Sequence, residues 1–136
     1  MRVRILIVED EMLVAMNLEC ILEDLGYEAV GIVPDFASAE VYFDQPLDLA
    51  LVDLNLRDGC TGPQIGARLG AGGVAVLFIT ANPGQLGEGV AGTIGVITKP
   101  ADEKVVRAAV EYALRGHCGR TEEPPATLRL FAGGAH

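Results

Sequence analysis

Polar side chains suited to phosphoryl chemistry follow four short apolar segments of this chain. Glu9 and Asp10 follow the first segment, and Asp53 follows a later one. Thr80 ends another apolar segment, and Lys99 comes directly after the last. Three carboxylates brought together repel one another, and a hard divalent cation such as Mg²⁺ relieves that repulsion. One carboxylate is then able to attack phosphorus, while an ammonium group and a hydroxyl group stabilise the phosphoryl oxygens.

Each of these features also has an ordinary structural interpretation. An acidic pair after a strand usually caps the next helix, and Asp53 alone would be typical of a turn. Thr80 could simply end its strand, and Lys99-Pro100 could begin a helix, because proline suits the first helical turn. All four features falling at the ends of successive apolar segments is far less expected by chance. The combination therefore favours a functional site.

The elements that must position these residues alternate between apolar and amphipathic segments. Short runs rich in β-branched residues predict strands buried on both faces of a sheet. The predicted strands cover 3–8, 28–33, 47–54, 74–80 and 95–98, and the predicted helices cover 11–25, 36–43, 62–70 and 101–115. This alternation predicts a doubly wound α/β fold with a five-stranded parallel sheet. Ligands of such sheets bind at the carboxyl ends of the strands, which is where the polar residues fall.

Two segments depart from this regular alternation. Residues 82–95 contain one proline and five glycines. Each internal glycine costs ~1 kcal/mol of helix stability relative to alanine, so we expect the fourth helix to be short or poorly ordered. Residues 117–136 are rich in glycine, glutamate and proline, and we expect a flexible C-terminal tail in which Phe131 belongs to a random coil. The folded domain would then cover 1–116.

The composition narrows the class of protein. The chain has 136 residues, half of them apolar, which suffices for one soluble domain with its own core. Its net charge of −9 argues against general binding to nucleic acid. No apolar run approaches the ~20 residues of a membrane helix. Three cysteines without a C-x-x-C spacing are typical of a reduced compartment, so we expect a cytoplasmic protein.

The polar residues stand in segments that resemble the response-regulator receiver domain, the CheY-like family. The matching segments are Ile-Leu-Ile-Val-Glu-Asp-Glu at 5–11, Leu-Asp-Leu-Ala-Leu-Val-Asp-Leu-Asn-Leu at 47–56, Phe-Ile-Thr-Ala at 78–81 and Ile-Thr-Lys-Pro at 97–100. The resemblance spans about 1–115, and this combination of motifs is highly specific. It implies the flavodoxin-like (βα)5 fold and a place in bacterial two-component or phosphorelay signal transduction.

The resemblance implies a role for each acidic residue of the cluster. Asp53 would be the phosphoacceptor, forming an aspartyl phosphate. Asp10 would bind Mg²⁺ directly, and Glu9 would do so through a water molecule. Asp53 and the backbone carbonyl of Asn55 would complete the protein ligands. Mg²⁺ is therefore the expected cofactor.

Other matching positions would act on the phosphoryl group itself. Thr80 would contact it and report its presence, and Lys99 would pair with its oxygens. Pro100 would follow the lysine through a cis peptide bond. Members of the family also dephosphorylate themselves, and the residues two beyond the phosphoacceptor and the threonine tune the attack of water. Those residues are Asn55 and Asn82 in this chain.

Three features depart from the family pattern. Many members carry an aromatic residue three positions before the lysine, and it swings inward when the threonine moves. Val96 occupies that position here, so this coupling cannot operate in its usual form. The loop after the phosphoacceptor commonly begins Met-Pro, and here it is Leu56-Arg57. The helix before the last strand belongs to the face through which many receivers bind targets, and here its segment is the glycine-rich 82–95.

We predict that 82–95 is poorly ordered without a phosphoryl group and becomes ordered on phosphorylation. Amide hydrogen exchange measured with and without the phosphoryl group should show protection of this segment rising on phosphorylation. Equal and strong protection in both states would contradict the prediction.

The favoured functional interpretation is a stand-alone phosphoswitch. It would take its phosphoryl group from a sensor histidine kinase or a phosphotransfer protein. It would catalyse its own phosphorylation and dephosphorylation without being a dedicated enzyme. Its output would be a contact with a protein target or a second copy through the 82–115 face, or the withdrawal of phosphoryl groups from a shared kinase.

Several alternatives compete with this interpretation. The chain could be a receiver fragment of a longer regulator, or a pseudo-receiver that binds proteins without being phosphorylated. A phosphohydrolase of the haloacid-dehalogenase type is disfavoured, because its chemistry needs an acid two residues after the nucleophile and Asn55 stands there. A dinucleotide-binding protein is disfavoured because no G-x-G-x-x-G follows the first strand.

Overall fold

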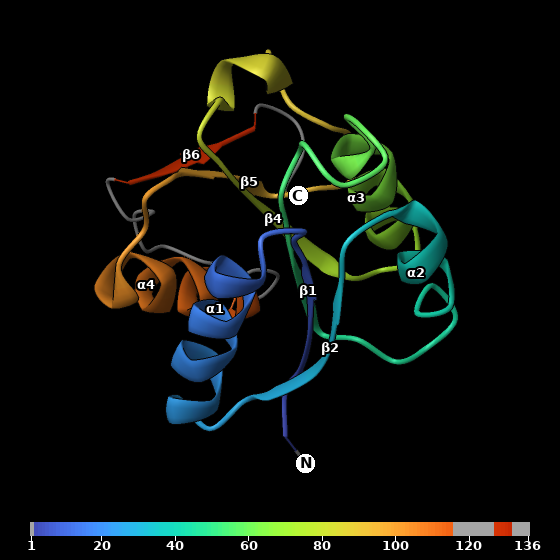
Figure 1. Ribbon diagram of the computed structural model, residues 1–136. Coiled ribbons are helices and arrows are strands. Elements are labelled where there is room, and N and C mark those ends of the chain that lie inside the picture. Colours follow the sequence, from blue (N-terminus) through green and yellow to red (C-terminus); the bar gives the residue numbers. More distant parts are fainter. Residues whose placement is uncertain (1, 116–126, 132–136) are drawn as a thin grey trace.

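The computed structural model describes residues 2–115 and 127–131, whose strands form one central sheet (Figure 1). The sheet order is β2-β1-β3-β4-β5-β6. The strands are β1 (Arg4–Val8), β2 (Glu28–Val33), β3 (Leu49–Val52), β4 (Ala75–Thr80), β5 (Gly95–Thr98) and β6 (Leu128–Leu130). The first five run parallel to one another, and β6 runs antiparallel to β5. The predicted doubly wound α/β fold is confirmed.

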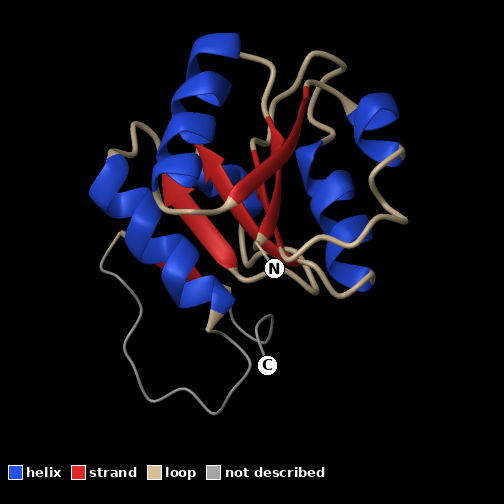
Figure 2. Cartoon of the chain, turned by 90° about the horizontal axis from the view of Figure 1, so that it is seen from below, coloured by secondary structure: helices blue, strands red, loops and turns tan. Residues whose placement is uncertain are grey.

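Helices cover both faces of the sheet. On one face lie α1 (Met12–Asp24) and α4 (Glu103–Leu114), and on the other lie α2 (Phe36–Glu40) and α3 (Gly62–Ala71). Figure 2 shows the strands enclosed between these two groups of helices. Within the described ranges, no helix is long and apolar enough to cross a membrane.

The core consists of two apolar clusters, one on each side of the sheet. Ile5 points toward α1 and α4, where it joins Leu22 and Val110. Leu6 joins the opposite cluster, which includes Ile65 of α3. Successive residues of β1 thus enter different clusters, as the two-residue period of a strand requires. Because both faces are buried, the central strands read as continuous apolar runs in the sequence.

The segment after β4 contains only a short 3₁₀ helix, η1 (Pro83–Leu86). The prediction of a short helix within residues 82–95 is therefore confirmed. Gly87 follows it with φ of +54°, a backbone conformation that favours glycine and ends the turn. The helix predicted over 36–43 is also shorter than expected, since α2 ends at Glu40 and a run of turns follows. Branched and aromatic residues at 41–43 have weak helix propensity, which accounts for the early end.

The prediction of a purely parallel five-stranded sheet followed by a flexible tail is wrong for residues 127–131. Leu128–Leu130 form β6, a sixth strand paired with the outer edge of β5. Leu128 and Phe131 are each only 4% exposed. The edge of β5 offers unpaired backbone groups, and a short apolar segment satisfies them by pairing. The rest of the predicted tail lies outside the described residues.

Candidate functional site

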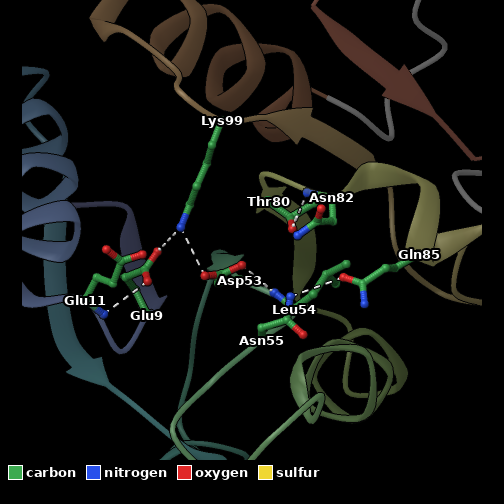
Figure 3. Close-up of polar contacts among 9 residues, drawn as sticks. All are labelled: Glu9, Glu11, Asp53, Leu54, Asn55, Thr80, Asn82, Gln85 and Lys99. Atoms are coloured by element: carbon green, nitrogen blue, oxygen red, sulfur yellow. Dashed lines mark hydrogen bonds and ion pairs between the residues drawn. The ribbon is translucent and has the colours of Figure 1, made fainter.

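The carboxyl ends of the central parallel strands meet at one edge of the sheet, and the predicted polar residues gather there (Figure 3). Glu9 follows β1, Asp53 follows β3 and Lys99 follows β5, while Thr80 is the last residue of β4. Asp53, Thr80 and Lys99 border a pocket of about 250 Å³ at this edge. The pocket is lined by Asp10, Glu11, Asp53, Asn55, Thr80, Ala81, Asn82 and Lys99.

Lys99 lies between the two buried carboxylates of the site. Its Nζ donates to Oε1 of Glu9 at 2.8 Å and to Oδ2 of Asp53 at 3.0 Å. The Glu9 side chain is 2% exposed, the Asp53 side chain 9% and the Lys99 side chain 16%. One ammonium group therefore neutralises part of the charge of two carboxylates that are largely removed from water.

Burial controls how these groups hold protons. It raises the pKa of the Glu9 carboxyl above its usual range, and the negative charge of Asp53 raises it further, against the lowering effect of Lys99. Burial also opposes the charge on Lys99, but hydrogen bonds to Glu9 and Asp53 outweigh it and raise the pKa of the ammonium. Lys99 therefore stays charged. The site is an electrostatically strained cluster in which additional positive charge would be stabilising.

Backbone amides hold the remaining carboxylate oxygens in place. The amide of Leu54 donates to Oδ1 of Asp53 at 2.7 Å, and the amide of Glu11 donates to Oε2 of Glu9 at 3.1 Å. Both side chains are therefore held by one backbone donor and one ammonium donor. These hydrogen bonds fix the orientation of both carboxylates before any ligand binds.

The acidic residues are close enough to share one metal ion. Glu9, Asp10 and Asp53 each offer a carboxylate oxygen, and these oxygens all lie within 4.8 Å of one another. Asp10 is exposed, while the other two carboxylates are buried. A set of oxygen donors beside an open pocket, with room for water molecules, fits Mg²⁺ better than a transition metal. Asn55 lines the same pocket.

A second group of polar residues lies on the side of Asp53 away from Glu9 (Figure 3). The amide of Asn82 donates to Oγ1 of Thr80 at 3.1 Å, which ties the start of the segment after β4 to the Thr80 hydroxyl. Nδ2 of Asn55 donates to Oε1 of Gln85 at 3.1 Å. The sequence did not single out Gln85. Its contact depends on the single turn of η1, which no pattern in the sequence specifies.

Two further predicted positions have distinct settings. The peptide bond between Lys99 and Pro100 is cis. Val96 lies in β5, is 1% exposed and packs in the apolar cluster that contains Phe78 and Phe131. The position at which many receivers carry an aromatic switch residue is therefore a closed part of the core here.

Gly62 brings α3 against the backbone of Asp53 and Leu54. A Cβ atom at this position would lie 2.0 Å from the carbonyl oxygen of Asp53 and 2.6 Å from Cα of Leu54. We predict that Gly62→Ala lowers the free energy of unfolding by about 1–3 kcal/mol, because neither backbone atom can move freely. Urea denaturation would measure the loss. Gly84→Ala is the matched control, since nothing lies within 4 Å of its added Cβ, and equal stability of the two variants would contradict the prediction.

The comparison with protein families agrees with this geometry. The chain matches the response regulator receiver domain over residues 5–111. It belongs to the response regulator receiver family. The match begins in β1 and ends in α4, so it contains every strand end of the site. This receiver domain thus has the family's sheet and an acidic cluster at the expected edge.

The receiver domain is similar to several PhyR proteins. It is 34% identical to the phyllosphere-induced regulator PhyR of Methylorubrum extorquens, over 84% of this chain and 44% of that protein. The solved receiver domain of Erythrobacter litoralis PhyR is 33% identical with a TM-score of 0.76, covering 90% of this chain and 97% of that one. The anti-anti-sigma factor PhyR of Bartonella quintana is 29% identical with a TM-score of 0.71, covering 85% and 48%. The chain therefore spans less than half the length of the curated relative that it matches.

Proposed function

We propose that this receiver domain is a Mg²⁺-dependent phosphoswitch in which Asp53 accepts a phosphoryl group. The observation that carries the proposal is the placement of Lys99 between Asp53 and Glu9, with Asp10 within metal-sharing distance of both. A purely structural ion pair would need one carboxylate, whereas phosphoryl transfer needs an acceptor, metal ligands and a cation together.

The chain's own residues supply the parts of the reaction. A carboxylate oxygen of Asp53 attacks phosphorus, the bond from phosphorus to the donor's histidine nitrogen breaks, and the imidazole leaves with the electron pair. The Lys99 ammonium pairs with one oxygen of the transferred phosphoryl group, and the Thr80 hydroxyl donates a hydrogen bond to another. Glu9, Asp10 and Asp53 would hold Mg²⁺, and the bound ion would supply positive charge beside the phosphoryl oxygens. Aspartyl phosphate then reverts when water attacks phosphorus and the Asp53 carboxylate leaves.

The proposed donor is a sensor histidine kinase or a phosphotransfer protein, met in the cytoplasm. The proposed output is a protein contact rather than nucleic-acid binding, in keeping with the net charge of −9. Because one similar protein is described as an anti-anti-sigma factor, a regulator of transcription factors is the kind of target we favour. Withdrawal of phosphoryl groups from a shared kinase is the second route, and it needs no target.

A small phosphodonor tests the proposal without the cognate kinase. The full chain is incubated with acetyl phosphate and Mg²⁺, and intact-protein mass spectrometry is used to detect one added phosphoryl group. Chelation of the metal should prevent the addition, and hydroxylamine should remove the group because it cleaves acyl phosphates. An unmodified chain in the presence of Mg²⁺, with NMR spectra showing the protein folded, would instead identify a pseudo-receiver.

The contact between Gln85 and Asn55 predicts a control on the lifetime of the phosphoryl group. Gln85 holds the Asn55 amide toward η1. Without that hydrogen bond the amide is free to turn toward the pocket and orient water. We predict that Gln85→Leu speeds dephosphorylation about three- to tenfold, the factor that one net hydrogen bond of ~1 kcal/mol corresponds to.

Loss of the phosphorylated mass with time would measure this rate. Gln64→Leu is the matched control, because Gln64 is exposed on α3. The effect should also vanish in an Asn55→Ala background, since Gln85 acts through Asn55. An equal acceleration with and without Asn55 would contradict the prediction.

A further inference from the structure

The outer edge of β5 is covered by a strand from the far end of the chain (Figure 1). β6 pairs antiparallel with β5 through Gly95↔Leu130, Val96↔Arg129 and Ile97↔Leu128. The amide of Phe131 extends the pairing by donating to the carbonyl of Ile94 at 3.1 Å. Main-chain pairing thus holds together residues that are more than 30 positions apart in the sequence.

Phe131 anchors this short strand in an apolar socket. Its side chain is 4% exposed, and its ring centroid lies 6.1 Å from that of Phe78. Leu86 and Val96 belong to the same buried cluster. A buried aromatic ring is the kind of contact that dominates the energy of a docked segment.

The receiver domain is shaped to admit this strand. A Cβ atom on Gly95 would lie 2.3 Å from the carbonyl oxygen of Arg129, although the φ of Gly95 is not positive. A Cβ atom on Gly89 would lie 2.3 Å from the Phe131 ring. Gly95 is thus needed for the close approach of a strand rather than for its own backbone conformation.

Arg129 sets the register of the strand against η1. Its guanidinium donates to the carbonyls of Pro83 and Gly87, both at 3.2 Å. The same guanidinium lies 5.4 Å from the centroid of the Phe131 ring. The edge therefore recognises three features at once, which are an extended backbone, an arginine and an aromatic residue two positions further on.

The strand in place does not use the whole edge. The pairing stops at Ile97, and Thr98, the last residue of β5, is exposed. A hollow of about 380 Å³ continues along the edge past the start of β6. It is lined by Pro83, Val96, Thr98, Pro100, Val105, Thr127 and Arg129. A longer strand in the same register would gain further pairing and fill this hollow.

We propose that the outer edge of β5 is a docking site for an extended, antiparallel β-segment of a partner protein, and that residues 127–131 occupy it as an intramolecular competitor. The partner segment would carry an apolar residue, an arginine and an aromatic residue at the positions of Leu128, Arg129 and Phe131. Strand addition to a sheet edge derives affinity from the main chain and specificity from side-chain pockets. Protection of an edge alone needs only a charge, a proline or a short strand, not a socket with two matched carbonyls. The proposal does not depend on phosphorylation of Asp53.

The test uses the full chain and a labelled peptide with the sequence of residues 126–133. Fluorescence anisotropy should show weak binding to the wild-type chain, because the tethered strand competes at high effective concentration. Phe131→Ala removes the anchor of the competitor and should bind the peptide at least about tenfold more tightly. Arg129→Ala should do the same, and NMR spectra of both variants report whether the domain stays folded. A peptide with alanine in place of its phenylalanine should bind neither the Phe131→Ala variant nor the Arg129→Ala variant.

Gly95→Ala provides the decisive control. Combined with Phe131→Ala it should abolish peptide binding, since its Cβ blocks the backbone of any strand in this register. Three outcomes would overturn the proposal. They are failure of the folded single variants to bind, equal binding to wild type and variants, and a concentration-dependent wild-type dimer that exchanges residues 127–131 between copies.

Discussion

Asp53→Asn should abolish phosphorylation by acetyl phosphate while leaving the fold intact. The amide has nearly the shape of the carboxylate and keeps an oxygen to accept the hydrogen bond from the Leu54 amide. It lacks the negative charge that makes the carboxylate a nucleophile and a metal ligand. Even changes in groups around metal ligands cost about 10–100-fold in affinity, so loss of a ligand should weaken Mg²⁺ binding at least about tenfold.

Intact-protein mass spectrometry and Mg²⁺ titration followed by NMR would measure the two effects. Asp44→Asn is the matched control, because Asp44 is exposed and lies away from the site. If the Asp53→Asn variant is still phosphorylated, the acceptor is a residue other than Asp53. If the affinity for Mg²⁺ is unchanged in this variant, Asp53 is not a ligand of the metal.

Lys99→Met should lower both the stability of the domain and the rate of its phosphorylation. Lys99 is the ammonium partner of Glu9 and of Asp53. Removing one member of a buried ion pair costs about 3–5 kcal/mol, and the open pocket reduces this to about 1–3 kcal/mol here. Loss of a preorganised donor to the phosphoryl oxygens should also slow phosphorylation by about 10²–10³-fold.

Magnesium separates these two consequences of losing Lys99. Binding of Mg²⁺ to the folded state should restore much of the lost stability, because the ion replaces the missing charge. It should not restore the rate of phosphorylation. Thermal unfolding with and without Mg²⁺ would measure the first effect, and Lys104→Met, at an exposed position on α4, is the control. A metal-free Lys99→Met protein as stable as wild type would contradict the electrostatic account of the site.

The sequence predicted the parallel part of the sheet well because burial on both faces leaves a strong signal. Runs such as those of β1 and β4 contain almost only apolar residues, and a polar residue follows β1 and ends β4. The order of the strands then brings Glu9, Asp53 and Lys99 together without further information. Their side chains approach one another because of the order of the strands in the sheet, and not because of the conformational preference of any single residue.

The sequence did not predict features that depend on non-local geometry. β6 has three residues, which is too short for a two-residue period to be recognised among its neighbours. Its stability comes from the socket for Phe131 and from Gly95, and both lie in other parts of the chain. The contact of Gln85 with Asn55 likewise exists only because η1 turns toward the loop after β3.

The most direct test of the phosphoswitch uses beryllofluoride, which mimics the phosphoryl group. ¹H–¹⁵N spectra of the wild-type chain and of Asp53→Asn are recorded with Mg²⁺ before and after its addition. We predict that wild-type signals of Asp10, Thr80 and Lys99 shift, with changes spreading into 82–95, while the variant does not respond. A folded wild-type chain whose spectrum responds to neither Mg²⁺ nor beryllofluoride would contradict the account.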